Sequence, residues 1–177
     1  MEGYPNQMAA ALAFINAHPG QIGFITISIG GNDTAGRTGT NVPAITAQLR
    51  AAAGPNVKIA GQNYQDPVLA NWLKGPTGQQ QAQASQATFH ANNDWLDSKF
   101  MLGGATVSAD IGTSFGTYYS WSGLQDYNGQ LVPAPVARLC TYTHNCDATS
   151  PNPRLTDAGK MQAANEIGWK LNVIPPN

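Results

Sequence analysis

A chain of 177 residues with 9 Lys or Arg and 10 Asp or Glu has a formal net charge of -1, and its 42% hydrophobic content suffices for a folded core. The charge balance argues against a nucleic-acid partner, which would require a basic patch. No apolar run reaches the roughly 20 residues that cross a bilayer, so we expect no membrane span.

The first third of the chain is expected to form a helix, a strand and a second helix. Residues 5–18 have helical periodicity, which ends at His18-Pro19-Gly20. Residues 22–29 are a nearly continuous β-branched and apolar run, typical of a parallel strand that is covered on both faces. A second helix is expected over 42–53, where Gly54-Pro55 ends it.

The rest of the chain continues this alternation. A second strand is expected over 57–64, followed by a long helical stretch that breaks at Gly75-Pro76 and resumes to about Phe100. A third strand is expected over 105–111, then a Gly- and Ser-rich loop with several aromatic residues, and a last helix over 156–171 with Thr156 as its N-cap. Alternating strands and helices predict an α/β fold with a parallel sheet, in a single domain that spans residues 1–177.

Polar residues that follow the expected strands are the candidate binding residues. Ligands of open parallel sheets bind beyond the carboxyl ends of the strands, which here lead into residues 30–36, 63–67 and 112–122. In the first loop, Gly30 and Gly31 let the backbone approach a ligand, and the Asn32 amide can donate to a developing oxyanion. Asp33 would hold this loop, although a plain turn capped by its side chain is an alternative. Tyr64, in the second loop, is a further binding candidate.

The two cysteines, Cys140 and Cys146, lie six positions apart with polar residues between them. Only His144 could complete a metal site there, which is too few ligands for zinc, so we expect no metal. The spacing favours a local disulfide, with two buried thiols as the alternative. Asn and Gln together outnumber all charged residues. The first five residues do not resemble a signal peptide, but the composition and the expected disulfide favour a secreted, extracellular location.

A family resemblance rests on several ordered segments. The run Ile27-Ser28-Ile29-Gly30-Gly31-Asn32-Asp33 resembles the third conserved block of the SGNH (GDSL-type) ester hydrolases of secreted bacterial type. Further segments that look like parts of the same family follow in order: residues 8–20, 63–67 with 72–76, 136–146, and Thr156-Asp157-Ala158-Gly159. The likeness covers most of residues 7–171.

The resemblance implies a flavodoxin-like three-layer α/β sandwich that hydrolyses acyl esters without a metal or organic cofactor. In that family a first-block serine attacks the acyl carbon and a histidine two residues after an aspartate acts as the base. Backbone amides and the third-block asparagine, here Asn32, stabilise the oxyanion. The implied substrate is a small-molecule ester or sugar ester.

The chain departs from the family pattern at the nucleophile and at the base. It contains no Gly-Asp-Ser sequence, so we expect an N-terminally incomplete version, the C-terminal two thirds of the family fold. Counting back from Asp157, the family's aspartate and histidine positions hold Asn152 and Arg154, and neither residue can act as a base. His144 is the histidine nearest to this block and is kept as a candidate.

Two functions therefore remain open. The first is an SGNH-type ester hydrolase, or a fragment of one. The alternative is a catalytically degenerate relative that binds a ligand or partner without turnover. The family's first strand would lie beside residues 22–29, and without it that strand would have an open edge. We expect the edge to be covered by residues 1–5, by a second copy in a homo-oligomer, or by a separate chain.

Overall fold

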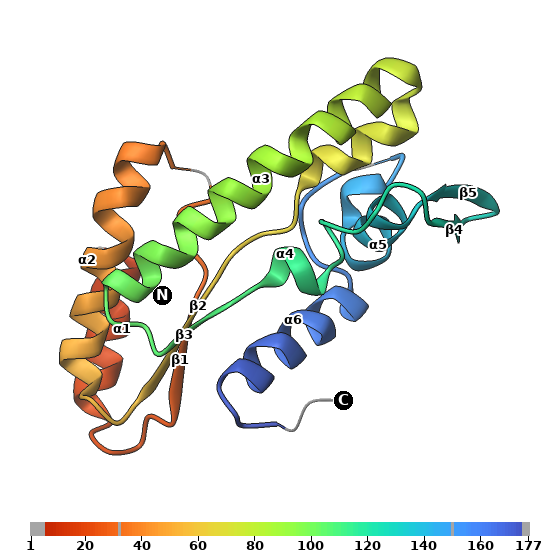
Figure 1. Cartoon of the computed structure of the whole chain (residues 1–177). Coiled ribbons are helices and arrows are strands. Elements are labelled where there is room, and N and C mark those ends of the chain that lie inside the picture. The colour runs from red at the N-terminus through yellow and green to blue at the C-terminus, as the bar shows by residue number, and fades with distance from the viewer. Residues whose placement is uncertain (1–5, 32, 150, 175–177) are drawn as a thin grey trace. The chain divides into compact units, whose positions relative to one another are not determined.

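The computed structural model describes residues 6–31, 33–149 and 151–174 (Figure 1). The chain divides into two compact units. The first comprises Met1–Gln62, Trp95–Ala109 and Trp169–Asn177, and the second comprises Asn63–Asp94 and Asp110–Gly168. The expectation of a single domain stays a prediction. None of the helices in the described ranges is both long and apolar enough to cross a lipid bilayer.

The first unit contains a three-stranded parallel sheet with its helices. Its elements are α1 (Gln7–Ala17), β1 (Phe24–Ile27), α2 (Ala35–Ala53), β2 (Lys58–Gln62), the end of α3 (Pro76–Leu102) and β3 (Val107–Ala109). The strand order is β1-β2-β3, and both pairs are parallel. Figure 1 shows α1 and α2 next to each other beside these strands. The predicted α/β class with a parallel sheet is confirmed, whereas the flavodoxin-like three-layer arrangement stays a prediction.

One face of the sheet is covered by the end of α3. Side chains of a strand alternate between the faces, and the register aligns Ile25 with Ile59 and Ile27 with Gly61. The ring of Phe100, from α3, lies directly over Gly61. Ser108, which pairs with Gly61 from the other side, donates to Asp97 of α3 at 2.6 Å. These contacts place the end of α3 on the face that Ile25 and Ile27 share.

The opposite face of β1 is open, which corrects the expectation that residues 22–29 are covered on both sides. Phe24 is 51% exposed, and Thr26 and Ser28 on the same face are also exposed. Lys58, the register partner of Phe24, reaches across this face to the carbonyl of Leu171. The face is thus occupied at β2 by the segment after α6 but is accessible at β1.

The second unit is mostly helical and packs around a small apolar core. Its elements are η1 (Pro67–Lys74), the first part of α3, α4 (Ile111–Ser114), β4 (Leu124–Tyr127), β5 (Gln130–Pro133), α5 (Ala134–Tyr142), η2 (His144–Cys146) and α6 (Asp157–Lys170). The buried core residues Val132, Val136, Ala137 and Cys140 are covered by the half-buried side chains of Trp72, Leu73, Trp121, Tyr127 and Cys146.

Several expected boundaries were wrong. α2 begins at Ala35 rather than at residue 42 and contains Pro43. The supposed aromatic loop after β3 contains α4 and an antiparallel β4–β5 hairpin. The helix α5, which was not expected, covers most of the segment 136–146. Thr156 is confirmed as the cap of the last helix, because its hydroxyl accepts from the Gly159 amide at 3.1 Å.

Candidate functional site

The loop after β1 is fixed by a glycine that no other residue could replace without strain. Gly30 has φ +96°, and a Cβ there would lie 2.9 Å from Thr38 Cγ2 and 3.2 Å from Val42 Cγ2. Thr38 is buried in the first turn of α2 and donates from its hydroxyl to the Gly30 carbonyl at 3.2 Å. The amide of Asp33 donates to the same carbonyl at 3.4 Å. The backbone of the loop is therefore anchored to α2.

The predicted oxyanion residue, Asn32, lies outside the described residues, so its role stays a prediction. The residues on either side of it are Gly31 and Asp33, and both are exposed to solvent. The loop belongs to the first unit, whereas the other site candidates belong to the second.

A buried asparagine joins the segments that follow β2 and β3. Asn63 is 2% exposed; its Nδ2 donates to Asp110 Oδ1 at 3.0 Å, and its Oδ1 accepts from the Gly112 amide at 2.9 Å. Asp110 also caps α4, because Oδ1 accepts from the Thr113 amide at 2.9 Å. Its own amide donates to Glu166 of α6 at 3.3 Å. This network was not predicted, although both Asn63 and Asp110 directly follow a strand.

Tyr64 is held through its backbone by a second buried asparagine, from α3. Asn93 is 3% exposed and donates from Nδ2 to the Tyr64 carbonyl at 2.6 Å, while its Oδ1 accepts from the Tyr64 amide at 3.3 Å. The same Nδ2 lies 2.7 Å from the Tyr118 hydroxyl, to which it donates. Tyr64 thus joins a polar cluster with Asn93 and Tyr118. The role of Tyr64 as a binding residue stays a prediction.

Next to this cluster lies a histidine–carboxylate pair. His90 Nδ1 is 3.0 Å from Asp94 Oδ2, one helical turn away on α3. The imidazole also packs on Tyr118, with 4.4 Å between the ring centroids. The sequence analysis gave His90 no role, yet the spacing of four residues was the available signal. Both side chains are more than half exposed, so the pair is accessible to solvent.

A deeply buried carboxylate lies at the start of η1. Asp66 is 0% exposed and accepts from the Val68 amide at 2.8 Å and from the Ser85 hydroxyl at 2.5 Å. Burial raises the pKa of Asp66 above its ordinary value, and these two hydrogen bonds oppose the effect. The side chain caps the 3₁₀ helix and ties it to α3.

Backbone hydrogen bonds join the segments that carry His144, Asn152 and Arg154, and the roles of these three residues stay predictions. The His144 amide donates to the Arg154 carbonyl at 2.9 Å, and the Asn152 amide donates to the His144 carbonyl at 3.0 Å. Asn152 Oδ1 accepts from the Arg154 amide at 3.1 Å, so this side chain closes a local turn. His144 and Arg154 are exposed. The Lys160 ammonium lowers the pKa of the neighbouring Asp157, and His144 contributes to the same shift.

Cys140 and Cys146 form the predicted disulfide, with their Cα atoms 5.1 Å apart. The disulfide joins η2 covalently to α5, and His144 is the first residue of η2. Asp147, which follows η2, accepts from the Thr149 amide at 2.9 Å.

One serine has the sequence spacing of a nucleophile elbow, which the sequence analysis did not identify. Gly112-Thr113-Ser114-Phe115-Gly116 has the G-x-S-x-G spacing of a nucleophile elbow. In the structure Ser114 is the last residue of the short helix α4, and its hydroxyl donates to the Ile111 carbonyl at 3.3 Å. A nucleophile elbow instead places its serine in the sharp turn between strand and helix. Ser114 therefore does not have the geometry of such a nucleophile.

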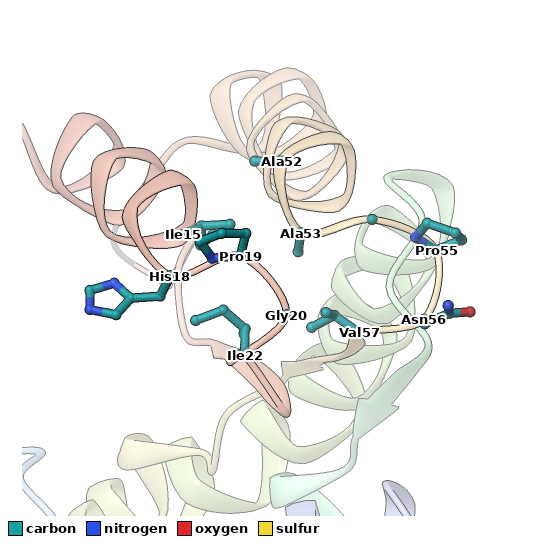
Figure 2. A pocket seen from close by; sticks show the side chains of 11 residues that line it. Ile15, His18, Pro19, Gly20, Ile22, Ala52, Ala53, Pro55, Asn56 and Val57 are labelled. Atoms are coloured by element: carbon teal, nitrogen blue, oxygen red, sulfur yellow. The ribbon is translucent and has the colours of Figure 1, made fainter.

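A surface pocket of about 290 Å³ lies elsewhere in the first unit, at the amino ends of the strands (Figure 2). Figure 2 shows the side chains of Ile15, Pro19, Ile22, Ala53 and Val57 around the hollow, and that of His18 turned outward. Ile22 precedes β1 and Val57 precedes β2. The pocket is thus at the opposite end of the strands from Gly30 and is not the predicted site.

Within residues 6–31, 33–149 and 151–174, no three His, Cys, Asp or Glu residues are grouped so that they could hold a metal ion. Comparisons with protein-family models, with curated proteins and with solved structures found no match for this chain.

Proposed function

We propose that this chain has the scaffold of an SGNH-type ester hydrolase and promotes acyl-ester hydrolysis through the loop at Gly30, Gly31 and Asn32. The observation that carries the proposal is the anchored loop after β1. The loop after a parallel strand contains Gly30, with φ +96°, whose carbonyl accepts a hydrogen bond from Thr38 of the following helix. Such a loop can direct backbone amides and the Asn32 amide at an oxyanion without adding charge.

The residues at the family's aspartate and histidine positions cannot act as a base. The chain also contains no Gly-Asp-Ser sequence that would supply the nucleophile. Asn152 uses its side-chain oxygen to accept from the Arg154 amide, and a guanidinium stays protonated at all working pH values. In a serine hydrolase that has lost its triad, oxyanion stabilisation and substrate binding still accelerate hydrolysis about 10³–10⁴-fold over the uncatalysed reaction in water. We therefore propose a weak, oxyanion-assisted hydrolysis without a covalent serine intermediate.

A second candidate function is ligand binding without turnover by the same scaffold. It is favoured by the local turn that occupies Asn152 and by the exposed Arg154, whose guanidinium can pair with a carboxylate. This function predicts that a carboxylate ligand stabilises the fold while ester hydrolysis stays at the background rate.

The rate of hydrolysis of p-nitrophenyl butyrate separates the two functions. A fluorophosphonate probe tests in addition whether the hydrolysis uses a serine nucleophile. We expect saturable hydrolysis above the buffer rate that the probe does not inhibit. The Asn32→Ala variant should lose most of it, since one oxyanion donor contributes about 10²–10³ in rate. An Arg154→Ala variant should retain the rate.

Other results would change the assignment. No hydrolysis, combined with thermal stabilisation by acetate or butyrate that Arg154→Ala abolishes, would support the binding function instead. Inhibition and covalent labelling by the probe would identify a serine nucleophile within this chain and contradict the mechanism without a serine.

A further inference from the structure

We propose that Arg138, which lies beside two tyrosine rings in the second unit, binds the carboxylate of a small organic acid. Arg138 is a half-buried residue of α5. Its Nε donates to the Phe115 carbonyl at 3.2 Å, and its Nη2 donates to the Ser114 carbonyl at 3.0 Å. These two hydrogen bonds hold the guanidinium in one orientation. The proposal is independent of the hydrolysis proposed above.

The bonds to the two carbonyls occupy only one edge of the guanidinium. The group is planar and carries N–H donors on all of its edges. Within residues 6–31, 33–149 and 151–174, neither hydrogen of Nη1 has a partner. In the same ranges no buried side-chain nitrogen or oxygen lacks a partner, so Nη1 must be in contact with solvent. The edge that carries Nη1 is therefore accessible to a ligand.

The positive charge of Arg138 is not neutralised by the part of the chain that the structure describes. No described carboxylate forms an ion pair with it, although the sequence contains more acidic than basic residues. A charge that is partly removed from water is stabilised by an anion. Capping of α4 does not require this charge, because the neutral amide of Gln162 also donates to the Ser114 carbonyl, at 3.2 Å.

Two tyrosine rings border the guanidinium. Arg138 Cζ lies 5.1 Å from the ring centroid of Tyr119 and 5.2 Å from that of Tyr142. Tyr142 packs on Phe115, with 4.9 Å between the ring centroids. Tyr119 is 45% exposed. The exposed ring beside the cation offers apolar surface to the hydrocarbon part of an organic acid.

The backbone next to Arg138 leaves room for its side chain. A Cβ built on Gly116 would lie 2.5 Å from Arg138 Cδ and 2.6 Å from its Nε. The side chain of Arg138 thus fills the space that a side chain at position 116 would need. Together with the two carbonyl bonds, this packing preorganises the guanidinium, which lowers the entropic cost of binding a ligand.

The guanidinium edge and the exposed ring together favour a carboxylate with an apolar substituent. The two oxygens of a carboxylate match neighbouring N–H donors of an arginine. Inorganic phosphate can use the same donors but has no apolar part that would pack on Tyr119. Acetate has only a methyl group. We therefore expect benzoate to bind more tightly than either acetate or phosphate.

Titration of the isotope-labelled wild-type chain with sodium benzoate, followed by NMR at constant ionic strength, tests the site. The side-chain Nε and Nη resonances of Arg138 should shift saturably, whereas those of the exposed Arg37 should not. Each resonance is assigned through the side-chain carbons to its own backbone amide, so this measurement needs no variant. Acetate and inorganic phosphate should bind about 3–10-fold more weakly than benzoate.

Variants test the two groups separately. Arg138→Lys keeps the charge but loses the parallel donors, so the dissociation constant of benzoate should rise about tenfold. Arg37→Lys is the matched control and should not change it. Tyr119→Ala removes an exposed ring and should abolish the preference for benzoate over acetate. Thermal unfolding followed by circular dichroism checks the fold, and the wild-type titration decides if Arg138→Lys does not fold.

Three results would overturn the proposal. If no anion shifts the Arg138 resonances saturably, this arginine only caps α4. Saturable shifts at Arg154 in place of Arg138 would instead support the ligand-binding function considered above for Arg154. Equal affinities for benzoate and phosphate that Tyr119→Ala does not change would refute the assignment of an organic acid.

Discussion

Gly61 and Phe100 are in direct contact on the helix-covered face of the sheet. A Cβ built on Gly61 would lie 2.2 Å from Phe100 Cγ, and Phe100 itself is 0% exposed. The absence of a side chain at Gly61 is thus what allows α3 to approach β2 so closely. The glycine is here a packing requirement and not a conformational one.

Gly61→Ala should therefore destabilise the first unit by about 1–3 kcal/mol, because the added methyl group overpacks a site that the Phe100 ring already fills. Urea unfolding followed by fluorescence or circular dichroism measures the loss. Gly23→Ala is the matched control, since nothing lies within 4 Å of a Cβ at that position. Equal unfolding free energies for the two variants would show that α3 does not pack on β2 in this way.

Asn93 and Asn92 are consecutive residues of α3 with different surroundings. Asn93 is buried and bonded to both backbone groups of Tyr64 and to the Tyr118 hydroxyl, whereas Asn92 is exposed. Asn93→Ala should lower the unfolding free energy by about 1–3 kcal/mol, since it leaves buried polar groups without a partner. Asn92→Ala should be neutral or slightly stabilising, because alanine favours the helix. Comparable losses for both would contradict the role assigned to Asn93.

The sequence predicted the parallel sheet and its strands because alternating apolar runs and helical segments carry that information locally. It did not predict the hairpin, although the signal was present: Asn128 and Gly129 have φ of 53° and 81°, as the central residues of a tight two-residue turn require. The early start of α2 had no local signal. Residues 35–41 include two glycines, and the helix is extended there by the packing of Thr38 on Gly30.

The candidate site was predicted only in part, for a similar physical reason. Gly30, His144, Asn152 and Arg154 were selected as candidates from residue types, spacing and the resemblance, and their roles stay predictions. The bonds of Asn93 to Tyr64 and Tyr118 could not, because they join residues 25–29 positions apart and depend on how α3 packs. Residue patterns identify candidate groups, but tertiary packing decides which of them meet.

The Cys140–Cys146 disulfide closes a short loop at the end of α5. A loop of this length constrains the unfolded chain by about 2 kcal/mol in the chain-entropy treatment. Dithiothreitol should therefore lower the urea midpoint of the wild-type chain and should not affect a Cys140→Ala/Cys146→Ala variant. A thiol assay should detect reactive cysteines only after reduction. Reactive thiols in the untreated protein would contradict the bond.

Asp66 should make the folded state less stable as the pH rises. Burial raises its pKa in the folded state above 3.8, while the unfolded chain keeps the ordinary value. Between these two values the folded state binds more protons, so the contribution of this group to stability is largest at low pH and falls as the pH rises through the folded pKa.

Asp66→Asn isolates this effect because the amide can still accept from the Val68 amide and can donate to the Ser85 hydroxyl, yet it does not titrate. Relative to the wild type, the variant should gain stability as the pH is raised from about 4 to 7. Urea unfolding at each pH measures the difference. A difference that is constant with pH, or one that changes in the opposite direction, would mean that the hydrogen bonds from Ser85 and Val68 outweigh burial.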